Sequence, residues 1–418
     1  MDKKEGARLL WYIADINFRP AGFAMNYYVA GGAIRDLLLG LPLRDVDYAF
    51  AATEEEFIQR NPAARKIQTA PCPVYLLDGQ EFAPLIRRDV MRDLSRRDFT
   101  VNALLLAENG VLRMHPDALE DLRNRRIRPA SPSALADDPV RAFRAARLAA
   151  RLPDFSLHEE TLVQMRALAA TNDAASSDAP SVAEVRSFLD AIPAEQVGKE
   201  LRKACLAHKP GNFLRALRQG DCLVPWFAEF VRAGSLPAGP AAYHNASVFE
   251  HTANIMDATA EVARHHGGTE AERALSVWMA LCHDLGKSET PGDILPHHYG
   301  HEGRGAVMAE SLGLRLRLPG IFVKAGKLAA LLHMKAGRYA SLRPGTRTDM
   351  LMRLHAADLV APFSWMAAAD SSQPELPDLW QRDCERLLAV RLPEHWRDKG
   401  ELSGIRLREL RCMALSHA

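Results

Sequence analysis

Two aspartates near the start of the chain, Asp45 and Asp47, are separated by one valine in a β-like segment. Alternate side chains of a strand share a face, so these carboxylates are expected about 7 Å apart on one side. Two like charges so placed repel each other unless a cation binds them. Mg²⁺ takes carboxylate oxygens and completes its shell with water and phosphate oxygens. The spacing therefore predicts a magnesium site for phosphoryl chemistry, although Asp-x-Asp also occurs at turns and exposed strand ends.

A glycine pair lies ahead of these aspartates. Gly31 and Gly32 follow the apolar run "YYVA" and precede the helical segment "AIRDLLLG". Glycine lets the backbone approach a phosphate closely, and the start of a helix favours negative charge. The pair therefore predicts a place for phosphate beside the two aspartates.

The ordered motifs resemble the head of class II nucleotidyltransferases, the family of CCA-adding enzymes and bacterial poly(A) polymerases. The resemblance rests on GG-x-x-R-D-x-L-L-G followed by D-x-D, on "RRDFTVNAL", and on "DDPVRAFRAARLAARL". It implies that Asp45, Asp47 and Glu81 are catalytic. It also implies that the nucleotide is bound by Gly31, Gly32, Arg35, Arg96, Arg97, Asp98, Asn102, Asp138, Arg141, Arg144 and Arg147.

The pair Asp138 and Arg141 carries two interpretations. Asp137 or Asp138 with Pro139 makes a good helix start, and the spacing of three favours an ion pair on one helix face. In the family, the pair recognises the incoming CTP or ATP. A carboxylate acceptor beside a guanidinium donor can imitate a base-pairing partner, so the base is selected without a nucleic-acid template.

Three features depart from the family pattern. "HPDALEDL", which contains His115, lacks the usual glycine-rich turn, and Gln196 stands where arginine is usual in a later motif. The span between Glu81 and Arg96 is short, whereas full CCA-adding enzymes carry a longer flexible loop there. Loss of this loop marks the CC-adding branch, in which a separate enzyme adds the final A. The sequence therefore favours CC addition, with full CCA addition as the alternative.

A second ordered set of motifs lies further along the chain: "VFEHTANIMD", "MALCHDLGK", "HHYGHE" and "LHAADLV". They resemble the HD-domain metal phosphohydrolases, an all-helical fold. The resemblance implies a divalent transition metal (Mn, Ni, Co or Fe) bound by His251, His283, Asp284 and Asp358, which would activate water. The remaining histidines His298, His301 and His333 are candidates for a second metal or for substrate contact.

These sites require an α+β chain with several domains. Short β-like runs from Tyr27 to Leu106 predict a small α/β head, and the Ala-, Leu- and Arg-rich segments after Pro139 predict helices. At 418 residues, two to four domains are expected. We assign them as a head (1–138), a helical neck and body (139–235), an HD domain (236–375) and a helical tail (376–418).

Composition limits the possible partners. The net charge of +1 gives no overall attraction to nucleic acid, so binding to tRNA must use local groups of arginines. The six cysteines lack CxxC spacing, and the N-terminal segment does not resemble a signal peptide, so a reduced, cytoplasmic protein without membrane contact is expected. The arginine groups are Arg87, Arg88, Arg92, Arg96 and Arg97; Arg123, Arg125, Arg126 and Arg128; and Arg141, Arg144, Arg147 and Arg151.

The expected function is therefore the addition of C residues to the 3' end of tRNA from CTP, and from ATP if the full CCA is made. Mg²⁺ would serve the head, and an HD phosphohydrolase would be a second activity. The alternatives are a poly(A) polymerase and a metal-dependent, RNA-binding phosphohydrolase whose head has become inactive.

Overall fold

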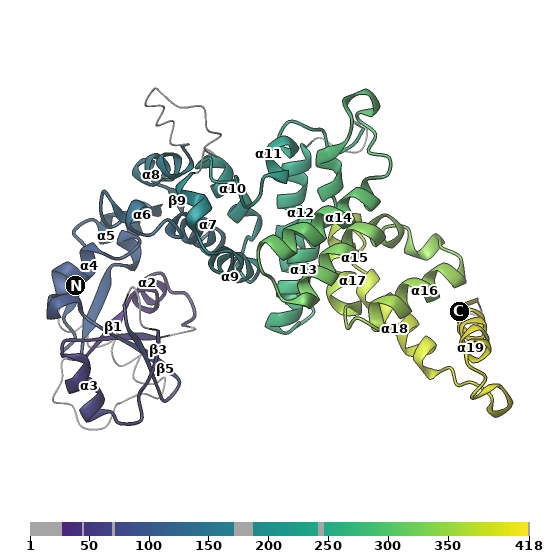
Figure 1. Ribbon diagram of the computed structural model, residues 1–418, viewed down its shortest axis with the longest axis horizontal. Helices are drawn as coiled ribbons and strands as arrows, with labels where there is room; N and C mark the ends of the chain where they lie inside the picture. The colour runs from purple at the N-terminus through teal and green to yellow at the C-terminus, as the bar shows by residue number, and fades with distance from the viewer. Residues whose placement is uncertain (1–26, 44–45, 69–71, 171–186, 241–245, 417–418) are drawn as a thin grey trace, which may run out of the picture. The chain divides into compact units, whose positions relative to one another are not determined.

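The computed structural model describes residues 27–43, 46–68, 72–170, 187–240 and 246–416 (Figure 1). Its contacts divide the chain into two compact units. Unit 1 runs up to Arg141 and adds Asp154–Leu168, and unit 2 comprises Ala142–Pro153 and the chain after Leu168. The predicted boundaries after 235 and 375 fall inside unit 2, so the four-domain division remains a prediction.

Unit 1 is built on one mixed sheet of seven strands in the order β3-β4-β5-β2-β1-β6-β7. Neighbouring strands are antiparallel except for the central β2 and β5, which are parallel. The strands are β1 Tyr27–Ala30, β2 Asp47–Phe50, β3 Arg65–Gln68, β4 Val74–Leu77, β5 Gln80–Pro84, β6 Leu104–Ala107 and β7 Leu112–Met114. The α-helices of unit 1 are α2 Gly32–Leu38, α3 Glu54–Arg60, α4 Val90–Ser95, α5 Ala118–Arg123, α6 Ala134–Asp137 and α8 Glu159–Ala169, which ends one residue beyond it.

Aromatic side chains anchor one end of the sheet. Phe50 and Phe57 are fully buried and stack with ring centroids 4.1 Å apart, and Phe82 and Tyr75 complete the cluster. Helix α3 begins with a capping box, in which Thr53 accepts from the backbone of Glu56 while the Glu56 carboxylate accepts from the backbone N–H of Thr53. This packing fixes β2 and β5, the strands that carry the predicted carboxylates.

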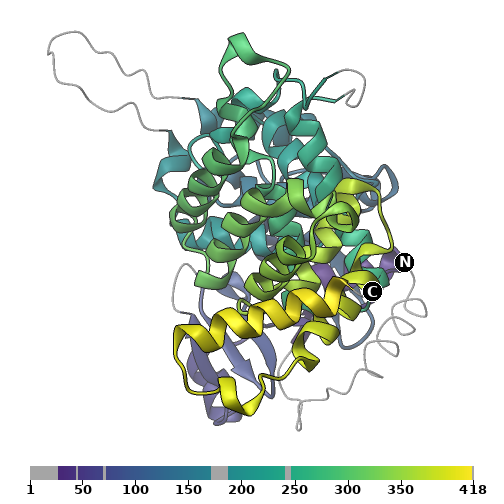
Figure 2. The same ribbon diagram turned by 90° about the vertical axis from the view of Figure 1, so that its right-hand side faces the viewer.

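Unit 2 is helical, and every strand of the described residues lies in unit 1. Its central helices α12, α15 and α17 pack against α13, whose fully buried Trp278 donates to the carbonyl oxygen of Phe322 in α15. Helix α19 packs on α16 and α18 (Figure 2). The α-helices of unit 2 are α7 Arg141–Arg151, whose first residue belongs to unit 1, α9 Ala194–Cys205, α10 Gly211–Gln219, α11 Glu229–Ala233, α12 Val248–His265, α13 Glu270–Cys282, α14 His301–Arg315, α15 Gly320–Ala336, α16 Pro344–His355, α17 Val360–Ser371, α18 Leu376–Ala389 and α19 Glu401–Ser416.

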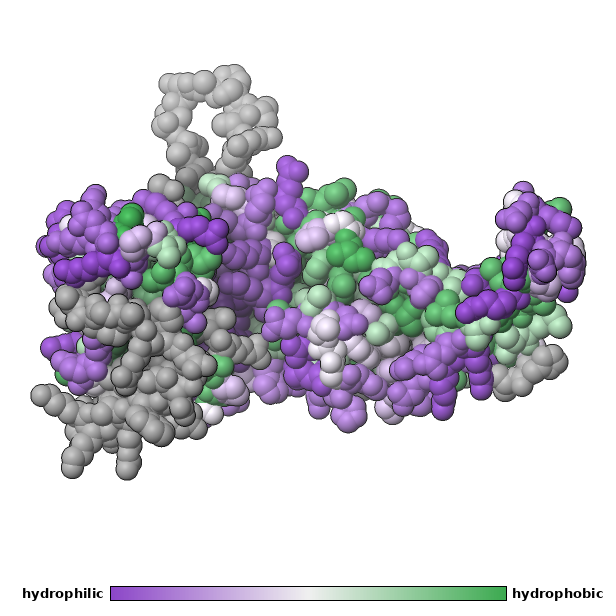
Figure 3. Space-filling model, turned by 90° about the horizontal axis from the view of Figure 1, so that it is seen from below, coloured by the Kyte–Doolittle hydropathy of each residue, from purple (hydrophilic) through white to green (hydrophobic). Residues whose placement is uncertain are grey.

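The predicted fold class, a small α+β head followed by helices, is confirmed. Helix α7, Arg141–Arg151, begins two residues after Pro139, near which its start was predicted, and the backbone N–H of Arg141 donates to the carbonyl oxygen of the extended Asp138, which ends α6. Hydrophilic residues cover much of the face drawn in Figure 3. Among the described residues, no helix has the length and apolar character needed to cross a membrane.

Candidate nucleotidyl-transfer and metal sites

The catalytic candidates Asp47 and Glu81 lie on neighbouring strands. They are register partners of the parallel pair β2 and β5, which places their exposed side chains on one face about 4.8 Å apart at the backbone. On the other side of β2, Asp47 pairs with Ala30, the residue before the glycine turn. Asp45 lies outside the described residues. The structure therefore brings Asp47, Glu81 and the glycines together at one end of the central strands.

The glycine turn is lined by an arginine. Gly31 has φ +69°, a backbone conformation that glycine adopts without strain. A Cβ at Gly31 would lie 3.3 Å from Nη1 of Arg97, so this guanidinium lies directly against the turn. Arg97 also donates from Nε and Nη2 to one oxygen of Asp93, at 3.1 and 2.9 Å. Asp93 is 3% exposed and was not among the predicted site residues.

Three other predicted residues form a hydrogen-bonded chain beside the turn. Arg35 is buried, donates to Asp36 and Asn102, and packs beneath Gly32. Asn102 in turn donates to Asp98 at 3.0 Å. The sequence implied nucleotide contacts for Arg35, Asp98 and Asn102, and the structure joins them in one hydrogen-bonded chain. The position of Arg35 makes it a support for the turn.

The base-recognition pair lies next to this chain. Nε of Arg141 is 3.7 Å from Asp138, while Nη1 and Nη2 donate to the carbonyl oxygens of Ala134 and Arg96. These two bonds fix the plane of the Arg141 guanidinium beside the carboxylate of Asp138. Because Arg96 itself lies 3.5 Å from Asp93, contacts run from the glycine turn to Asp138 without leaving unit 1.

The remaining predicted arginines are largely engaged with acids. Arg144 and Arg147 lie 3.5 and 2.5 Å from the buried carboxylate of Glu200, within unit 2. Arg128 contacts Asp121 and Glu160, and Arg125 contacts Asp154. The arginine groups therefore offer less uncompensated charge for RNA than their sequence alone indicates.

In unit 2 six donors converge in two groups of three. His251, His283 and Asp370 form one group, and Asp284, His301 and His333 form the other, each with its ligand atoms within 4.8 Å of one another. The facing Nε2 atoms are 3.3 Å apart for His251 and His283, and 3.1 Å apart for His301 and His333.

Asp284 joins the two groups. Its Oδ2 lies 3.3 Å from both His251 and His283, while its Oδ1 lies 3.3 Å from His333 and 3.5 Å from His301. One carboxylate therefore faces two sets of imidazoles, as a ligand that bridges two ions would.

A close backbone contact makes this convergence possible. A Cβ at Gly286, two residues after Asp284, would lie 2.1 Å from the carbonyl oxygen of His301. Real Cβ atoms do not approach so closely, so only glycine allows the segment after α13 to pack on the start of α14. This contact brings His283 and Asp284 to His301.

The protonation of the cluster reflects its carboxylates. Burial alone would lower the pKa of His251, but hydrogen bonds and charge from Asp284 and Asp370 raise it to about 9. Burial would raise the pKa of Asp284, but His283 and Lys287 hold it well below its usual range. The carboxylates are therefore ionised, and a metal must compete with a proton at His251.

The donor set fits divalent metal ions. Oδ1 of Asp284 is buried and accepts no hydrogen bond, which is costly unless a cation binds it. Imidazole and carboxylate together suit transition metals. In the head, the carboxylates of Asp47 and Glu81 are the hard oxygen donors that Mg²⁺ takes.

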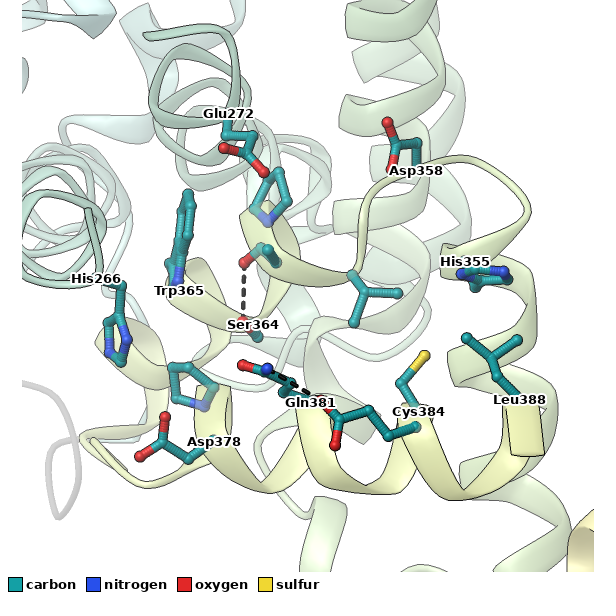
Figure 4. Close-up of a pocket in the computed structure, with 15 residues that line it drawn as sticks. His266, Glu272, His355, Asp358, Ser364, Trp365, Asp378, Gln381, Cys384 and Leu388 are labelled. Atoms are coloured by element: carbon teal, nitrogen blue, oxygen red, sulfur yellow. Dashed lines mark hydrogen bonds between the residues drawn. The ribbon is translucent and has the colours of Figure 1, made fainter. Parts of the chain in front are cut away.

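The structure does not bring Asp358 to the cluster. Asp358 lies in a left-handed turn after α16, with φ 56°, and lines a separate cavity of about 330 Å³ with Glu272, Trp365 and Asp378 (Figure 4). The cluster carboxylate from this part of the chain is Asp370, in the last turn of α17. Ten helical residues, about 15 Å, separate it from the start of α17, so the predicted ligand was placed too early in the chain.

Of the additional histidines, His301 and His333 belong to the cluster and His298 does not. His298 is within hydrogen-bond distance of Oγ1 of Thr290 (2.7 Å) and of the carbonyl oxygen of Pro237 (2.9 Å). It therefore holds the loop that leads into α14.

Comparisons with known proteins agree with this architecture. The HD domain family matches residues 248–362. A multifunctional CCA protein of Azoarcus sp. is 34% identical over 370 residues, which cover 82% of each protein, and one of Methylococcus capsulatus is 32% identical over 94% of each. The CCA-adding enzyme of Bacillus stearothermophilus in complex with CTP shares the fold, with a TM-score of 0.61 and 20% identity over 100% of this chain and 94% of that one.

Fold and motifs together define a nucleotidyltransferase that also carries an HD domain. The identity and coverage of the relatives specify it further. The chain belongs to the family of CCA-adding tRNA nucleotidyltransferases, among those with an HD domain.

Proposed function

We propose that the head adds cytidines from CTP to the 3' end of tRNA, without a nucleic-acid template. The observation that carries this proposal is the placement of Asp47 beside the glycine turn and Glu81. The contacts from Arg97 through Asp93 and Arg96 to Arg141 support it further, because they join the glycine turn beside Asp47 to a pair suited to reading a base.

In this reaction the 3' hydroxyl of tRNA attacks the α-phosphate of CTP and pyrophosphate leaves. Arg97 and the backbone at Gly31 and Gly32 hold the triphosphate. Asp138 accepts from the exocyclic amine of the base while Arg141 donates to its ring acceptors. Asp45 and Asp47, with Glu81, would hold Mg²⁺, which would supply charge stabilisation for the attacking and leaving oxygens.

Addition of CC alone is supported by the segment between Glu81 and Arg96. After the end of β5 at Pro84 it contains a short 3-10 turn, Ile86–Arg88, and then α4, which Asp89 caps and whose Leu94 lies in the core. The segment is therefore occupied by ordered elements, and it does not contain the longer loop associated with the switch from C to A. A separate enzyme would then add the terminal A.

For the HD domain we propose hydrolysis of phosphate esters with two divalent transition-metal ions. Asp284 would bridge the ions, one held by His251, His283 and Asp370 and the other by His301 and His333. Such ions lower the pKa of bound water and polarise the phosphoryl group. The buried, unsatisfied Oδ1 of Asp284 supports the bridging role.

The experiment that tests the head uses three tRNA transcripts: one that ends before the CCA sequence, one after its first C, and one after its second C. Each is incubated with the purified protein and CTP or ATP separately. Addition of two C residues and no A supports CC addition, and A added to the third transcript shows full CCA addition. Long A tails on unrelated RNA would indicate a poly(A) polymerase, and no incorporation would indicate an inactive head.

The HD proposal is tested by metal content and hydrolysis. Two equivalents of Mn, Ni, Co or Fe per chain would support it, together with opening of 2',3'-cyclic phosphates to monoesters or release of phosphate from monoesters. Hydrolysis that persists in an Asp284→Ala variant would contradict it.

A further inference from the structure

A buried carboxylate in the head, Asp93, holds two of the arginines assigned to the nucleotide. Its side chain is 5% exposed, compared with 36% for Arg96 and 22% for Arg97. The three groups carry a net charge of +1, so the arginines remain attractive to a triphosphate although they share one acid. Arg96 and Arg97 follow Asp93 by three and four residues, the spacing of an ordinary ion pair on a helix surface. The burial of Asp93 distinguishes this group from such a surface pair.

The contact with Arg97 fixes the direction of its guanidinium. Nε and Nη2 both donate to Oδ2 of Asp93, which leaves Nη1 directed against Gly31, 3.3 Å from where a Cβ would lie. An arginine side chain free in solvent samples many rotamers, and ordering it on binding costs free energy. A guanidinium already held over the turn avoids that cost.

We propose that Asp93 is a positioning residue for phosphate binding: it holds Arg97 over the Gly31–Gly32 turn, so that CTP and pyrophosphate meet an ordered cation. The inference rests on the proposed nucleotidyl transfer, and it adds a residue that touches no substrate. The affected affinity is that of the phosphates, shared by CTP, ATP and pyrophosphate, while binding of tRNA is left unchanged.

The test compares Asp93→Asn with Asp89→Ala in the full chain. Asn keeps the size of the side chain and removes its charge. Asp89 caps the same helix by accepting from Met91 and Arg92, so its loss weakens α4 without touching the acceptor of Arg97. The measurements are KM for CTP, inhibition by pyrophosphate, KM for tRNA, kcat and the melting temperature.

We expect Asp93→Asn to raise KM for CTP and the inhibition constant of pyrophosphate by the same factor, about tenfold, the change expected when a hydrogen-bonded charge pair is lost. KM for tRNA should stay constant, and Asp89→Ala should leave both phosphate constants unchanged. Asp93→Glu, which restores the charge, should recover part of the loss.

An unchanged pyrophosphate constant in Asp93→Asn would overturn the inference. So would a fall in kcat alone, accompanied by a lower melting temperature, or an equal effect of Asp89→Ala. Calorimetric titration with CTP and with pyrophosphate in Mg²⁺ gives the same comparison without turnover. A wild-type protein that binds both but adds no nucleotide would contradict the proposed function, whereas equal binding by wild type and Asp93→Asn would contradict the role of Asp93.

Discussion

The two sites of this protein are built in opposite ways. In the head, Asp47 and Glu81 are exposed at one end of the central strands, and the neighbouring arginines are held by a buried acid. In the HD domain, His283 and Asp284 are 0% and 2% exposed, and six donors from the helical unit face one another. A site that must admit the end of a large RNA leaves part of its coordination to the substrate, whereas a metal centre can be completed by the protein itself.

The largest effect should follow from Asp47→Asn. Loss of this carboxylate should lower nucleotide incorporation by at least about a hundredfold, because charge stabilisation in the transition state is lost. Hydrolysis by the HD domain should stay at the wild-type rate. Incorporation assays and phosphate release on the same preparation provide the comparison. Incorporation at the wild-type rate would remove Asp47 from the catalytic site.

A smaller effect, a loss of metal affinity in the HD domain, is expected when Asp370 is replaced but not when Asp358 is. Even indirect partners of metal ligands typically contribute roughly ten- to a hundredfold to affinity, so Asp370→Ala should weaken metal binding by at least that much. Asp358→Ala should leave both metal content and nucleotide incorporation unchanged, because its side chain lines a different cavity. Metal analysis after dialysis is the measurement. The opposite pattern would restore Asp358 as the ligand.

Two matched capping boxes allow the stability of the units to be compared. Thr53 begins α3 in the head and Thr269 begins α13 in the helical unit, each in a reciprocal pair with a glutamate three residues later. Replacing either threonine by alanine should cost about 1 kcal/mol of unfolding free energy. In a chemical denaturation, CTP binding reports on the head and metal retention on the helical unit. Thr53→Ala should lower the denaturant midpoint measured by CTP binding, and Thr269→Ala that measured by metal retention. Equal effects of both variants on both measurements would indicate one cooperative unit.

The smallest expected effect concerns the thiols. Burial raises the pKa of Cys205 and of Cys222 to about 12, and that of Cys282 well above its usual value. Only the thiolate is nucleophilic, so at pH 8 these protonated thiols of unit 2 should resist a thiol reagent, while partly exposed Cys72 in the head reacts. Mass spectrometry of labelled peptides distinguishes them. Fast labelling of Cys205 would mean that the helical unit opens readily.

Much of both sites could be predicted from the sequence, because the features that form them are local. The alternation around Asp47, the turn at Gly31 and Gly32, and the adjacent His283 and Asp284 each lie within one short element. The residues that sequence missed depend on tertiary packing. Asp370 lies at the end of a helix that is apolar over most of its length, and only the packing of α17 against α12 and α13 directs it to the cluster.

Asp93 was missed for a related reason. It stands three and four residues before two arginines, a spacing usual for exposed helices. Its burial arises because α4 packs on the sheet through Leu94, and the sequence of a six-residue helix does not reveal which side will be covered.

The contact at Gly286 limits how this chain can vary. All other amino acids carry at least one further carbon at this position, and every one-base change of a glycine codon that alters the residue introduces that carbon. The methyl group of alanine alone would meet the His301 carbonyl and push α14 away from the segment after α13. The spacing between the two sets of imidazoles thus depends on a residue without a side chain, at a position where no single mutational step is conservative.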